Sequence, residues 1–394
     1  MKALRHHAVV VAAVAALAIR FCGTAAADDE RFRIGGILSF SGAYGIIGES
    51  MKRGVEIAVE ERGGKVLGRS IELLWEDDQT KADIAVQKGT RMLANNVEML
   101  YGAISSSSTL ALMKLSERRK VPILITASAD DRITGTDKTR YAFRTSGNSS
   151  SENMSVAQFL KTSGYKKLYG VAADYTVMRD GWTLLKQHAK AAGIEVVGED
   201  FPPLGAMDYS VIIDKVAHSG ADVLAVNVTG NDAVTFVKQA GEVRLNDKVK
   251  MVGPNLMDEL MANAAGAAAL GVQSAIRYHF SYENPRNRKF VEAYRKKFNT
   301  FPDPFAGEAY DGMSWWLEVV ESTGSMDHDK WVAAFEHSTN PNSVDGVKVM
   351  HVCSHQATQS GLWAEVVKGS SPLPAYTMKI KDEYPPDAIF TSCD

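Results

Sequence analysis

The first half of the chain has two patterns of apolar residues: short continuous runs, and residues repeated at helical spacing. Four apolar runs have the length of buried strands: residues 34–40, 71–76, 98–103 and 121–126. Between these runs apolar residues recur at helical spacing, for example at Met51 and Val55. Strands that alternate with amphipathic helices are typical of right-handed βαβ units, so this half predicts a parallel sheet covered by helices.

The same alternation starts again in the second half. Further strands are expected at residues 167–172, 194–198, 223–228, 249–252 and 272–280. Helical patterns separate or follow them at residues 156–160, 182–192, 211–217, 233–240, 288–298 and 307–320. Two more strands are expected at residues 362–367 and 376–380. Two successive sets predict two α/β lobes, and a cleft where the carboxyl ends of their strands face one another.

The first residues have the pattern of a cleavable export leader. Lys2 and Arg5 precede an apolar run over residues 8–19, and three alanines end at Ala27. The run is too short to anchor the chain across a bilayer. The sequence therefore predicts a signal peptide at residues 1–27, cleaved near Ala27, and a mature protein outside the cytoplasmic membrane.

Composition narrows the classes of partner. Of the 394 residues, 45% are hydrophobic and 23% charged, as in ordinary globular proteins. A net charge of −3 gives no reason to expect nucleic acid as a partner. Of the three cysteines, Cys22 lies in the leader, which leaves Cys353 and Cys393 as an even pair. Because export leads to an oxidising compartment, a disulfide between them is expected.

Signals for metal or catalytic chemistry are weak. His351, Cys353 and His355 would share one face of a strand, but all three come from one element and Cys353 has a partner in Cys393, so no metal site is predicted. The chain has no nucleophile elbow, no phosphate loop and no helical zinc pair. We therefore expect no enzyme activity and no cofactor.

Hydroxyl and small residues follow two expected strands. The run Ser105–Thr109, which includes Ser106 and Ser107, opens a helix, and Ser128, Ala129 and Asp130 follow the next strand. Backbone N–H groups and hydroxyls at a helix start suit an anion such as a carboxylate. Helix capping alone explains many such serines.

Several longer stretches resemble the periplasmic binding proteins of branched-chain amino-acid ABC importers. They are RIGGILSFSGAYGIIG from Arg33, WEDDQTKADIAVQKGTRML from Trp75, YGAISSSST from Tyr101, VPILITASA from Val121, and the text from Gly220 to Asn255. The resemblance implies the type I binding-protein fold, with two doubly wound parallel-sheet lobes joined by three hinge crossings near residues 145–148, 277–281 and 355–360. It divides the chain into lobe 1, residues 28–146 with 279–356, and lobe 2, residues 147–278 with 357–394.

The family's ligand contacts fall on this chain unevenly. The carboxylate-binding serine falls on Ser106, with backbone support from residues 128–130. The family's ammonium-binding glutamate falls on Asn255, and its threonine that holds both ligand groups falls on Asp130. The tyrosine positions fall on Ile47, Met178 and Thr229, while Tyr44 and Tyr175 lie close in sequence and can serve instead.

The loss of the glutamate changes the expected ligand. A buried ammonium without a carboxylate partner costs several kcal/mol. The sequence therefore favours a carboxylate-bearing ligand without an α-amino group, although Asp130 is an alternative ammonium partner. The stretch from His355 to Gln359 resembles a branch associated with aromatic and other small organic acids.

The sequence as a whole predicts a monomeric periplasmic receptor that delivers a small organic ligand to a membrane ABC permease. An amino-acid binding protein is the first alternative. An exported α/β hydrolase and a periplasmic ligand sensor are the others, and a nucleophile–base pair would be needed for the hydrolase.

Overall fold

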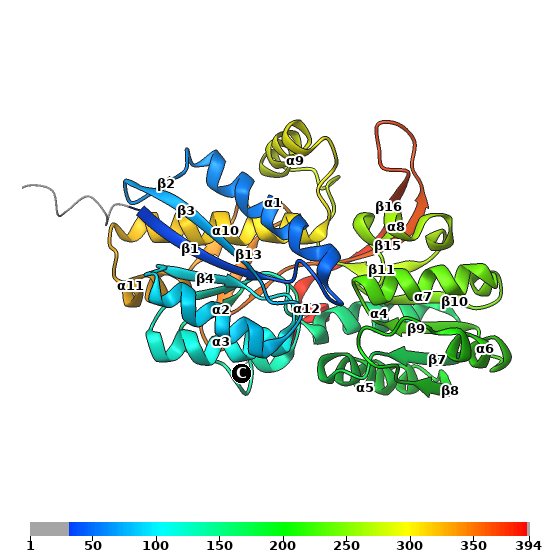
Figure 1. The fold of residues 1–394 in the computed structure, drawn as a ribbon. Coiled ribbons are helices and arrows are strands. Elements are labelled where there is room, and N and C mark those ends of the chain that lie inside the picture. The colour runs from blue at the N-terminus through cyan, green and yellow to red at the C-terminus, as the bar shows by residue number, and fades with distance from the viewer. Residues whose placement is uncertain (1–30, 392–394) are drawn as a thin grey trace, which may run out of the picture.

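Two lobes lie side by side in the computed structural model, which describes residues 31–391 (Figure 1). Each lobe has its own sheet, and the chain order of strands and helices alternates as the apolar pattern indicates. The predicted class, α/β with two doubly wound lobes, is therefore confirmed.

Lobe 1 contains a nine-stranded sheet in the order β12-β13-β14-β6-β5-β4-β1-β3-β2. The strands from β14 to β3 in this order are parallel, and the edge strands pair antiparallel. Their bounds are β1 (Arg31–Leu38), β2 (Lys65–Val66), β3 (Arg69–Asp77), β4 (Met99–Gly102), β5 (Ile123–Ile125), β6 (Ala142–Arg144), β12 (Thr339–Asn340), β13 (Lys348–His351) and β14 (Gln356–Thr358).

Helices cover both faces of this sheet (Figure 1). Alternate residues of β1 point to opposite faces, so Ile34 packs in the core of α1 and α10, and Ile37 in that of α2 and α3. The helices of this lobe are α1 (Gly45–Glu61), α2 (Ala82–Ala94), α3 (Ser106–Arg119), η1 (Asp131–Ile133), α9 (Pro285–Phe298), α10 (Pro304–Thr323) and α11 (His328–Glu336).

Lobe 2 contains a seven-stranded sheet in the order β16-β15-β11-β10-β9-β7-β8. Its strands are β7 (Lys167–Ala172), β8 (Glu195–Asp200), β9 (Val223–Asn227), β10 (Lys250–Pro254), β11 (Gln273–Ile276), β15 (Gly361–Lys368) and β16 (Tyr376–Tyr384). Its helices are α4 (Ser149–Ser163), α5 (Thr176–Ala191), α6 (Ser210–His218), α7 (Asn231–Glu242), η2 (Leu245–Asp247), α8 (Glu259–Ala265), η3 (Gly266–Ala269) and α12 (Pro386–Ile389). One core lies under α4 and α5, where Trp182 and Leu160 pack, and another under α7 and α8.

The chain passes between the two sheets three times, at residues 145–148, 277–284 and 359–360. Each passage leaves one sheet at the end of a strand, after β6, β11 and β14. The three passages lie together between the lobes, so the lobes are joined along one side. The three expected hinge crossings are present.

The segment around His355 differs from the expectation. Residues 351–355 were expected to continue one strand, with His351, Cys353 and His355 on a shared face. Instead β13 ends at His351, a turn follows, and His355 has a positive φ of 58°. The buried His355 ring stacks on Phe143 at 4.1 Å between centroids, and its Nε2 lies 2.9 Å from Glu336 Oε1. Its position is explained by packing, and the described residues contain no cluster of His, Cys, Asp and Glu suited to a metal.

Candidate functional site

A small cavity of about 50 Å³ lies between the lobes, where the carboxyl ends of the two parallel sheets meet. It has walls from both lobes. Among the residues singled out from the sequence, those that line it are Tyr44, Ile47, Ser106, Ala129, Met178, Thr229 and Asn255. These positions are far apart in the sequence, and the fold brings them together.

Two of the remaining predicted residues, Ser128 and Asp130, do not line this cavity. The Ser128 hydroxyl lies 2.8 Å from the Ala103 carbonyl oxygen and 2.5 Å from Thr109 Oγ1, so it fixes the loop below the cavity. The Asp130 carboxylate accepts hydrogen bonds from Arg132 Nε at 3.0 Å and Nη2 at 2.6 Å. The Asp130 carboxylate thus pairs with Arg132 and does not line the cavity. Asp130 is therefore not in a position to bind a ligand ammonium, the alternative that the sequence analysis left open.

Ser107 and Tyr175 also lie outside the cavity lining, and they contact one another. The Tyr175 hydroxyl, from lobe 2, accepts a hydrogen bond from the Ser107 N–H at 2.8 Å and lies 3.2 Å from Ser105 Oγ. The tyrosine therefore connects lobe 2 to the first turn of α3 in lobe 1. The structure places this pair as a contact between lobes.

The lobe 1 wall of the cavity is the N-terminus of α3 beside the loop after β5. Ser105 caps the helix in an extended conformation, and the buried Ser106 hydroxyl accepts a hydrogen bond from the Asp130 N–H at 3.3 Å. Backbone N–H groups of the first helical turn have no partner within their own helix and favour negative charge. This wall therefore offers hydrogen-bond donors.

A buried arginine holds the loop after β5 in place. Arg144 Nη1 donates to the carbonyl oxygens of Asp130 at 2.7 Å and Ser128 at 3.2 Å, and its Nε lies 2.6 Å from Gln356 Oε1. Burial lowers the pKa of Arg144 to about 10, which leaves it charged at neutral pH. Sequence reasoning did not single out Arg144, although an arginine in a short apolar strand is a signal for such a role.

Two charged residues that line the cavity were also missed from the sequence. Arg277, on the second passage between lobes, donates through Nε to Glu152 Oε1 at 2.6 Å, and its Nη2 contacts the same oxygen. Its Nη1 donates to the Ala127 carbonyl oxygen in lobe 1 at 2.8 Å. The side chains of Arg277 and Glu152 are 5% and 11% exposed. The available signal was a lone arginine directly after the apolar residues of β11.

The lobe 2 wall has both polar and apolar side chains, and it includes the amides of Asn227 and Asn255. Asn255 follows β10 with a positive φ of 43°, and its carbonyl oxygen accepts a hydrogen bond from Thr229 Oγ1 at 2.9 Å. Within residues 31–391, no hydrogen bond of the Asn255 side-chain amide is found. Met178 and Pro254 supply apolar surface beside it.

Tyr44 lies across the cavity from this wall, at the start of α1. Its side chain is buried, and burial together with the nearby Tyr175 and Asp232 raises its pKa well above the usual value. The Tyr44 hydroxyl is therefore neutral and can act as a hydrogen-bond donor at neutral pH.

The lobes also touch at a second place beside Tyr44. Asn231, the first residue of α7, donates from its side chain to the Gly42 carbonyl oxygen at 2.9 Å and from its backbone to that of Ala43 at 3.0 Å. Together with the Tyr175–Ser107 contact, this pair of contacts joins the lobes on both sides of the cavity. The structure is therefore one in which the lobes are closed on each other.

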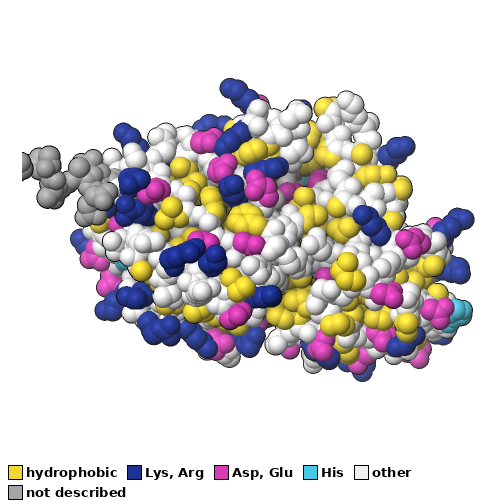
Figure 2. Space-filling view, in the orientation of Figure 1, with side chains coloured by type: hydrophobic (Ala, Val, Ile, Leu, Met, Phe, Trp, Pro, Cys, Tyr) yellow, Lys and Arg dark blue, Asp and Glu magenta, His cyan; other side chains and the backbone are white. Residues whose placement is uncertain are grey.

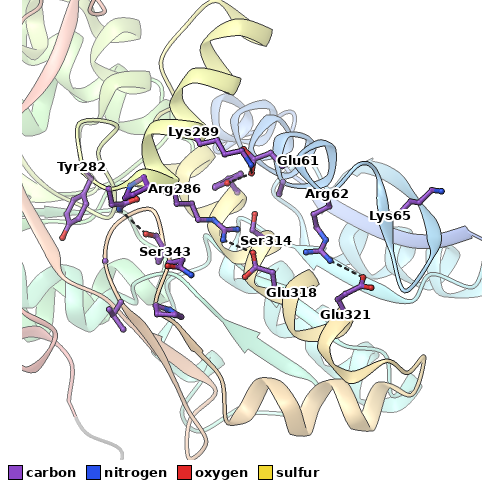
Figure 3. A pocket seen from close by; sticks show the side chains of 18 of the residues that line it. Glu61, Arg62, Lys65, Tyr282, Arg286, Lys289, Ser314, Glu318, Glu321 and Ser343 are labelled. Carbon is purple, nitrogen blue, oxygen red and sulfur yellow. Dashed lines mark hydrogen bonds and ion pairs between the residues drawn. The ribbon is translucent and has the colours of Figure 1, made fainter.

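Larger hollows lie elsewhere on the molecule. One of about 930 Å³ lies in lobe 1 between α1, α9 and α10, and Figure 3 shows its ion pairs Arg286–Glu318, at 2.8 Å, and Arg62–Glu321, at 3.3 Å. It is open to solvent, and its side chains come from helices, loops and the short edge strand β2, away from the carboxyl ends of the parallel strands where open α/β sheets bind ligands. Size alone therefore does not mark the functional site.

Basic and acidic side chains are mixed over both lobes on the face of the molecule that Figure 2 shows. No helix within residues 31–391 has the length and apolar character needed to cross a bilayer. The expected signal peptide, residues 1–27, and Cys393 lie outside the described residues, so the leader and the Cys353–Cys393 pairing stay predictions.

Comparisons with known proteins agree with the fold. The family model described as periplasmic binding protein matches residues 31–371. The chain is 30% identical over 321 residues to Leu/Ile/Val-binding protein homolog 6 of Brucella melitensis, which covers 79% of this chain and 81% of that protein.

Solved structures give the same result. A solute-binding protein of an ABC transporter from Rhodopseudomonas palustris BisB5, solved with 3,4-dihydroxybenzoic acid, superposes with a TM-score of 0.84 at 25% identity, covering 91% of this chain and 98% of that one. Another, from Rhodopseudomonas palustris HaA2 with p-hydroxybenzoic acid, has the same TM-score and identity and covers 90% and 97%. These relatives are solute-binding proteins, not enzymes. The chain belongs to the periplasmic binding protein family and is a solute-binding protein of the ABC-transporter type.

Proposed function

We propose that this protein captures a small carboxylate-bearing compound without an α-amino group, with aromatic acids as the favoured class, and delivers it to an ABC permease. The observation that carries the proposal is the composition of the cavity between the lobes. Its lobe 1 wall offers the α3 N-terminus and Ser106 as donors, and its lobe 2 wall offers Asn255 where an amino-acid binder has a carboxylate.

The net charge of the cavity supports this ligand class. Glu152 and Arg277 are the acidic and basic residues that line it within residues 31–391, and they pair with each other. An ammonium group would then find no uncompensated negative charge, and a buried ion without a partner is costly. A carboxylate is stabilised by the α3 N-terminus and by hydroxyl donors.

The relatives support the aromatic branch of this class. Two structural neighbours at 25% identity were solved with hydroxybenzoic acids. The apolar side chains that line the cavity, Met178 and Pro254 of lobe 2 and Ile104 and Phe305 of lobe 1, suit a ring or a short hydrocarbon.

Binding requires movement of the lobes. The cavity of about 50 Å³ is far smaller than the roughly 150 Å³ that accommodates benzene in a protein core. A ring compound therefore enters only when the Tyr175–Ser107 and Asn231–Gly42 contacts open, and the lobes then close around it. Small-angle scattering should show a more extended protein when these contacts are removed.

An α-amino acid is the second candidate, and Glu152 favours it. This carboxylate lines the cavity, and within residues 31–391 no hydrogen bond to its Oε2 is found. The name of the Brucella relative, Leu/Ile/Val-binding protein homolog 6, also supports an amino-acid ligand.

One experiment separates the two candidates. Calorimetry of the purified mature protein with benzoate, 4-hydroxybenzoate and 3,4-dihydroxybenzoate, and with leucine, isoleucine and valine, should detect binding in the first group. A ligand at a hundred times its dissociation constant adds about 2.7 kcal/mol of stability, so a thermal-shift assay gives an independent reading. Micromolar binding of leucine, isoleucine or valine with no binding of the acids would refute the proposal.

The proposal also covers the maturation of the protein, its oligomeric state and its lobe boundaries. We place cleavage of the leader near Ala27, a Cys353–Cys393 disulfide, and a monomer in the periplasm, with lobe boundaries at residues 28–146 with 279–356 and 147–278 with 357–394, apart from residues 357 and 358, which lie in β14 of the lobe 1 sheet. N-terminal sequencing of the exported protein and thiol titration after unfolding without reductant test the first two. A mature N-terminus far from Asp28, or two titratable thiols, would contradict them.

A further inference from the structure

We propose that the pair Arg277–Glu152 determines which ligand charge the cleft accepts, because Arg277 neutralises Glu152 and so withholds it from an ammonium group of the ligand. This inference rests on the proposed function and deepens it. It assigns a specificity role to two residues that lie outside the set expected from the sequence.

The position of the pair is the first support. Arg277 and Glu152 both line the cavity between the lobes, and both side chains are about nine-tenths buried or more. Glu152 lies in the first turn of α4 in lobe 2, and Arg277 lies on the passage from β11 to α9. A charge held here acts on a ligand through a medium of low effective dielectric constant, so its effect is larger than at the surface.

The contacts of Arg277 are the second support, because they fix it at this point. Its Nε and Nη2 contact Glu152 Oε1, its Nη1 donates to the Ala127 carbonyl oxygen at 2.8 Å, and its own carbonyl oxygen accepts from Gln359 Nε2 at 3.3 Å. Arg277 is thus bound to lobe 1, to lobe 2 and to the third passage between them. Its guanidinium cannot leave Glu152 without also losing the hydrogen bond to Ala127 in lobe 1, and the Gln359 contact holds its backbone in place.

The state of the neighbouring carboxylates is the third support. Asp130 is paired with Arg132, with Nη2 to Oδ2 at 2.6 Å, and Asp131 accepts from the Ser150 hydroxyl at 2.7 Å. Neither lines the cavity. Of the acidic residues within the described part of the chain, Glu152 is therefore the one placed to meet a ligand ammonium.

The consequences for selectivity follow from the charges. With the pair intact the cavity has no net charge from side chains, and the α3 N-terminus favours an anion. Without the arginine, Glu152 becomes a buried, uncompensated carboxylate, which repels an anionic ligand and attracts a cationic one. Without the glutamate, Arg277 attracts an anion more strongly.

Benzoate and benzylamine test this directly, because they share a ring and carry opposite charges. Calorimetry should show that the wild type prefers benzoate, and that Arg277→Gln shifts the ratio of the two dissociation constants toward benzylamine by at least tenfold. Arg277→Lys, which keeps the charge, should retain the wild-type preference, and Glu152→Gln should shift the ratio at least tenfold toward benzoate. Arg179→Gln, at a partly exposed arginine of α5 that pairs with Asp174 away from the cavity lining, is the matched control and should leave the ratio within twofold of the wild type. Ratios within twofold of wild type for both Arg277→Gln and Glu152→Gln would overturn the proposal.

A second measurement needs no ligand. In Arg277→Gln the buried Glu152 carboxylate loses its cation, whereas the double variant Arg277→Gln, Glu152→Gln buries a neutral amide there. The melting temperature of Arg277→Gln at pH 7 should therefore lie below that of the double variant, because a buried charge without a partner is costly. Equal melting temperatures for the two variants would contradict the role of Arg277 as the neutralising group. If the wild type binds none of the acids, the proposed function is refuted. The melting-temperature comparison then decides by itself whether Arg277 neutralises Glu152.

Discussion

The two walls of the cleft differ in what they offer a ligand. The lobe 1 residues that line the cavity are uncharged: Ser106 and the α3 N-terminus offer donors beside apolar side chains, and Ser128 and Arg144 fix the loop beneath. The lobe 2 wall has more polar groups, among them the Asn255 amide and the Arg277–Glu152 ion pair, beside the apolar Met178 and Pro254. The difference indicates that lobe 1 binds the polar end of a ligand through neutral donors in a fixed geometry, while lobe 2 sets the charge that the cleft accepts.

The largest expected effect concerns the support of the lobe 1 wall. Replacing Arg144 by methionine removes the guanidinium donors from the Ser128 and Asp130 carbonyl groups, from Gln356 and from Thr134. We expect a loss of about 3–5 kcal/mol in the free energy of unfolding, because several buried polar groups lose partners at once. Urea denaturation measures this loss.

The control for this change is Arg140→Met, at a side chain 56% exposed that pairs with Asp329 at the surface. It should cost less than about 1 kcal/mol, since surface ion pairs contribute little. Equal losses at the two positions would mean that the lobe 1 wall does not depend on Arg144.

Two adjacent serines test whether lobe 1 binds the polar end. Ser106 lines the cavity, whereas Ser107 is exposed and its N–H donates to Tyr175. Ser106→Ala should weaken binding of a carboxylate ligand by about 1.5–3 kcal/mol, the range for a hydrogen bond to a charged group. Ser107→Ala should leave the affinity unchanged, because its backbone N–H remains. Calorimetry of both variants decides, and equal affinities would assign the polar end to another wall.

Acid conditions should affect lobe 2 through Asp232, in the first turn of α7 beside the Asn231 contact. Burial raises the pKa of Asp232 to about 6. The hydrogen bond from the Gly205 N–H lowers the pKa, but its effect is smaller than that of burial. The folded protein therefore holds this proton more tightly than the unfolded chain does, so stability from this group is present at low pH and is lost as the pH rises through about 6.

The pH effect of Asp232 is measurable by substitution. Between pH 5 and pH 8 the wild type should lose about 1–2 kcal/mol that Asp232→Asn does not lose. Asp214→Asn, at an exposed acid of the same lobe, should follow the wild type. Urea denaturation curves of the three proteins at pH 5 and pH 8 provide the comparison. If Asp232→Asn loses as much stability as the wild type, Asp232 is not the cause of the pH dependence.

The smallest expected effect concerns the contact between the two walls. Tyr175→Phe removes the hydroxyl that accepts from the Ser107 N–H at 2.8 Å. Since the contact exists only when the lobes are closed, the closed form should lose about 0.5–1.5 kcal/mol. Small-angle scattering without ligand should show a larger radius of gyration, and Tyr165→Phe, on the far side of lobe 2, should not. No expansion in Tyr175→Phe would mean that closure is held by other contacts.

Much of the fold could be predicted from the sequence, because long apolar runs and helical spacings have few structural solutions. The strand at 167–172 was expected with the bounds that β7 has, and most other strands lie within a few residues of their predicted positions. The short strand β6 and the turn at residues 352–355 were not predicted, since three-residue strands and turns are decided by their neighbours in the sheet. The serines after β4 and the small residues after β5 were found because helix starts at strand ends have a local signature.

The sequence by itself determined the two-lobed α/β architecture and the helix start at Ser106, because both depend on the order of residues over short distances. The tertiary structure alone decided which side chains share the cavity. It used the Tyr175 hydroxyl to join the lobes and brought Arg277 to Glu152, 125 residues away in the chain. A charge acts on whatever lies within a few ångströms of it, and that neighbourhood is set only when both sheets have formed and the lobes have closed.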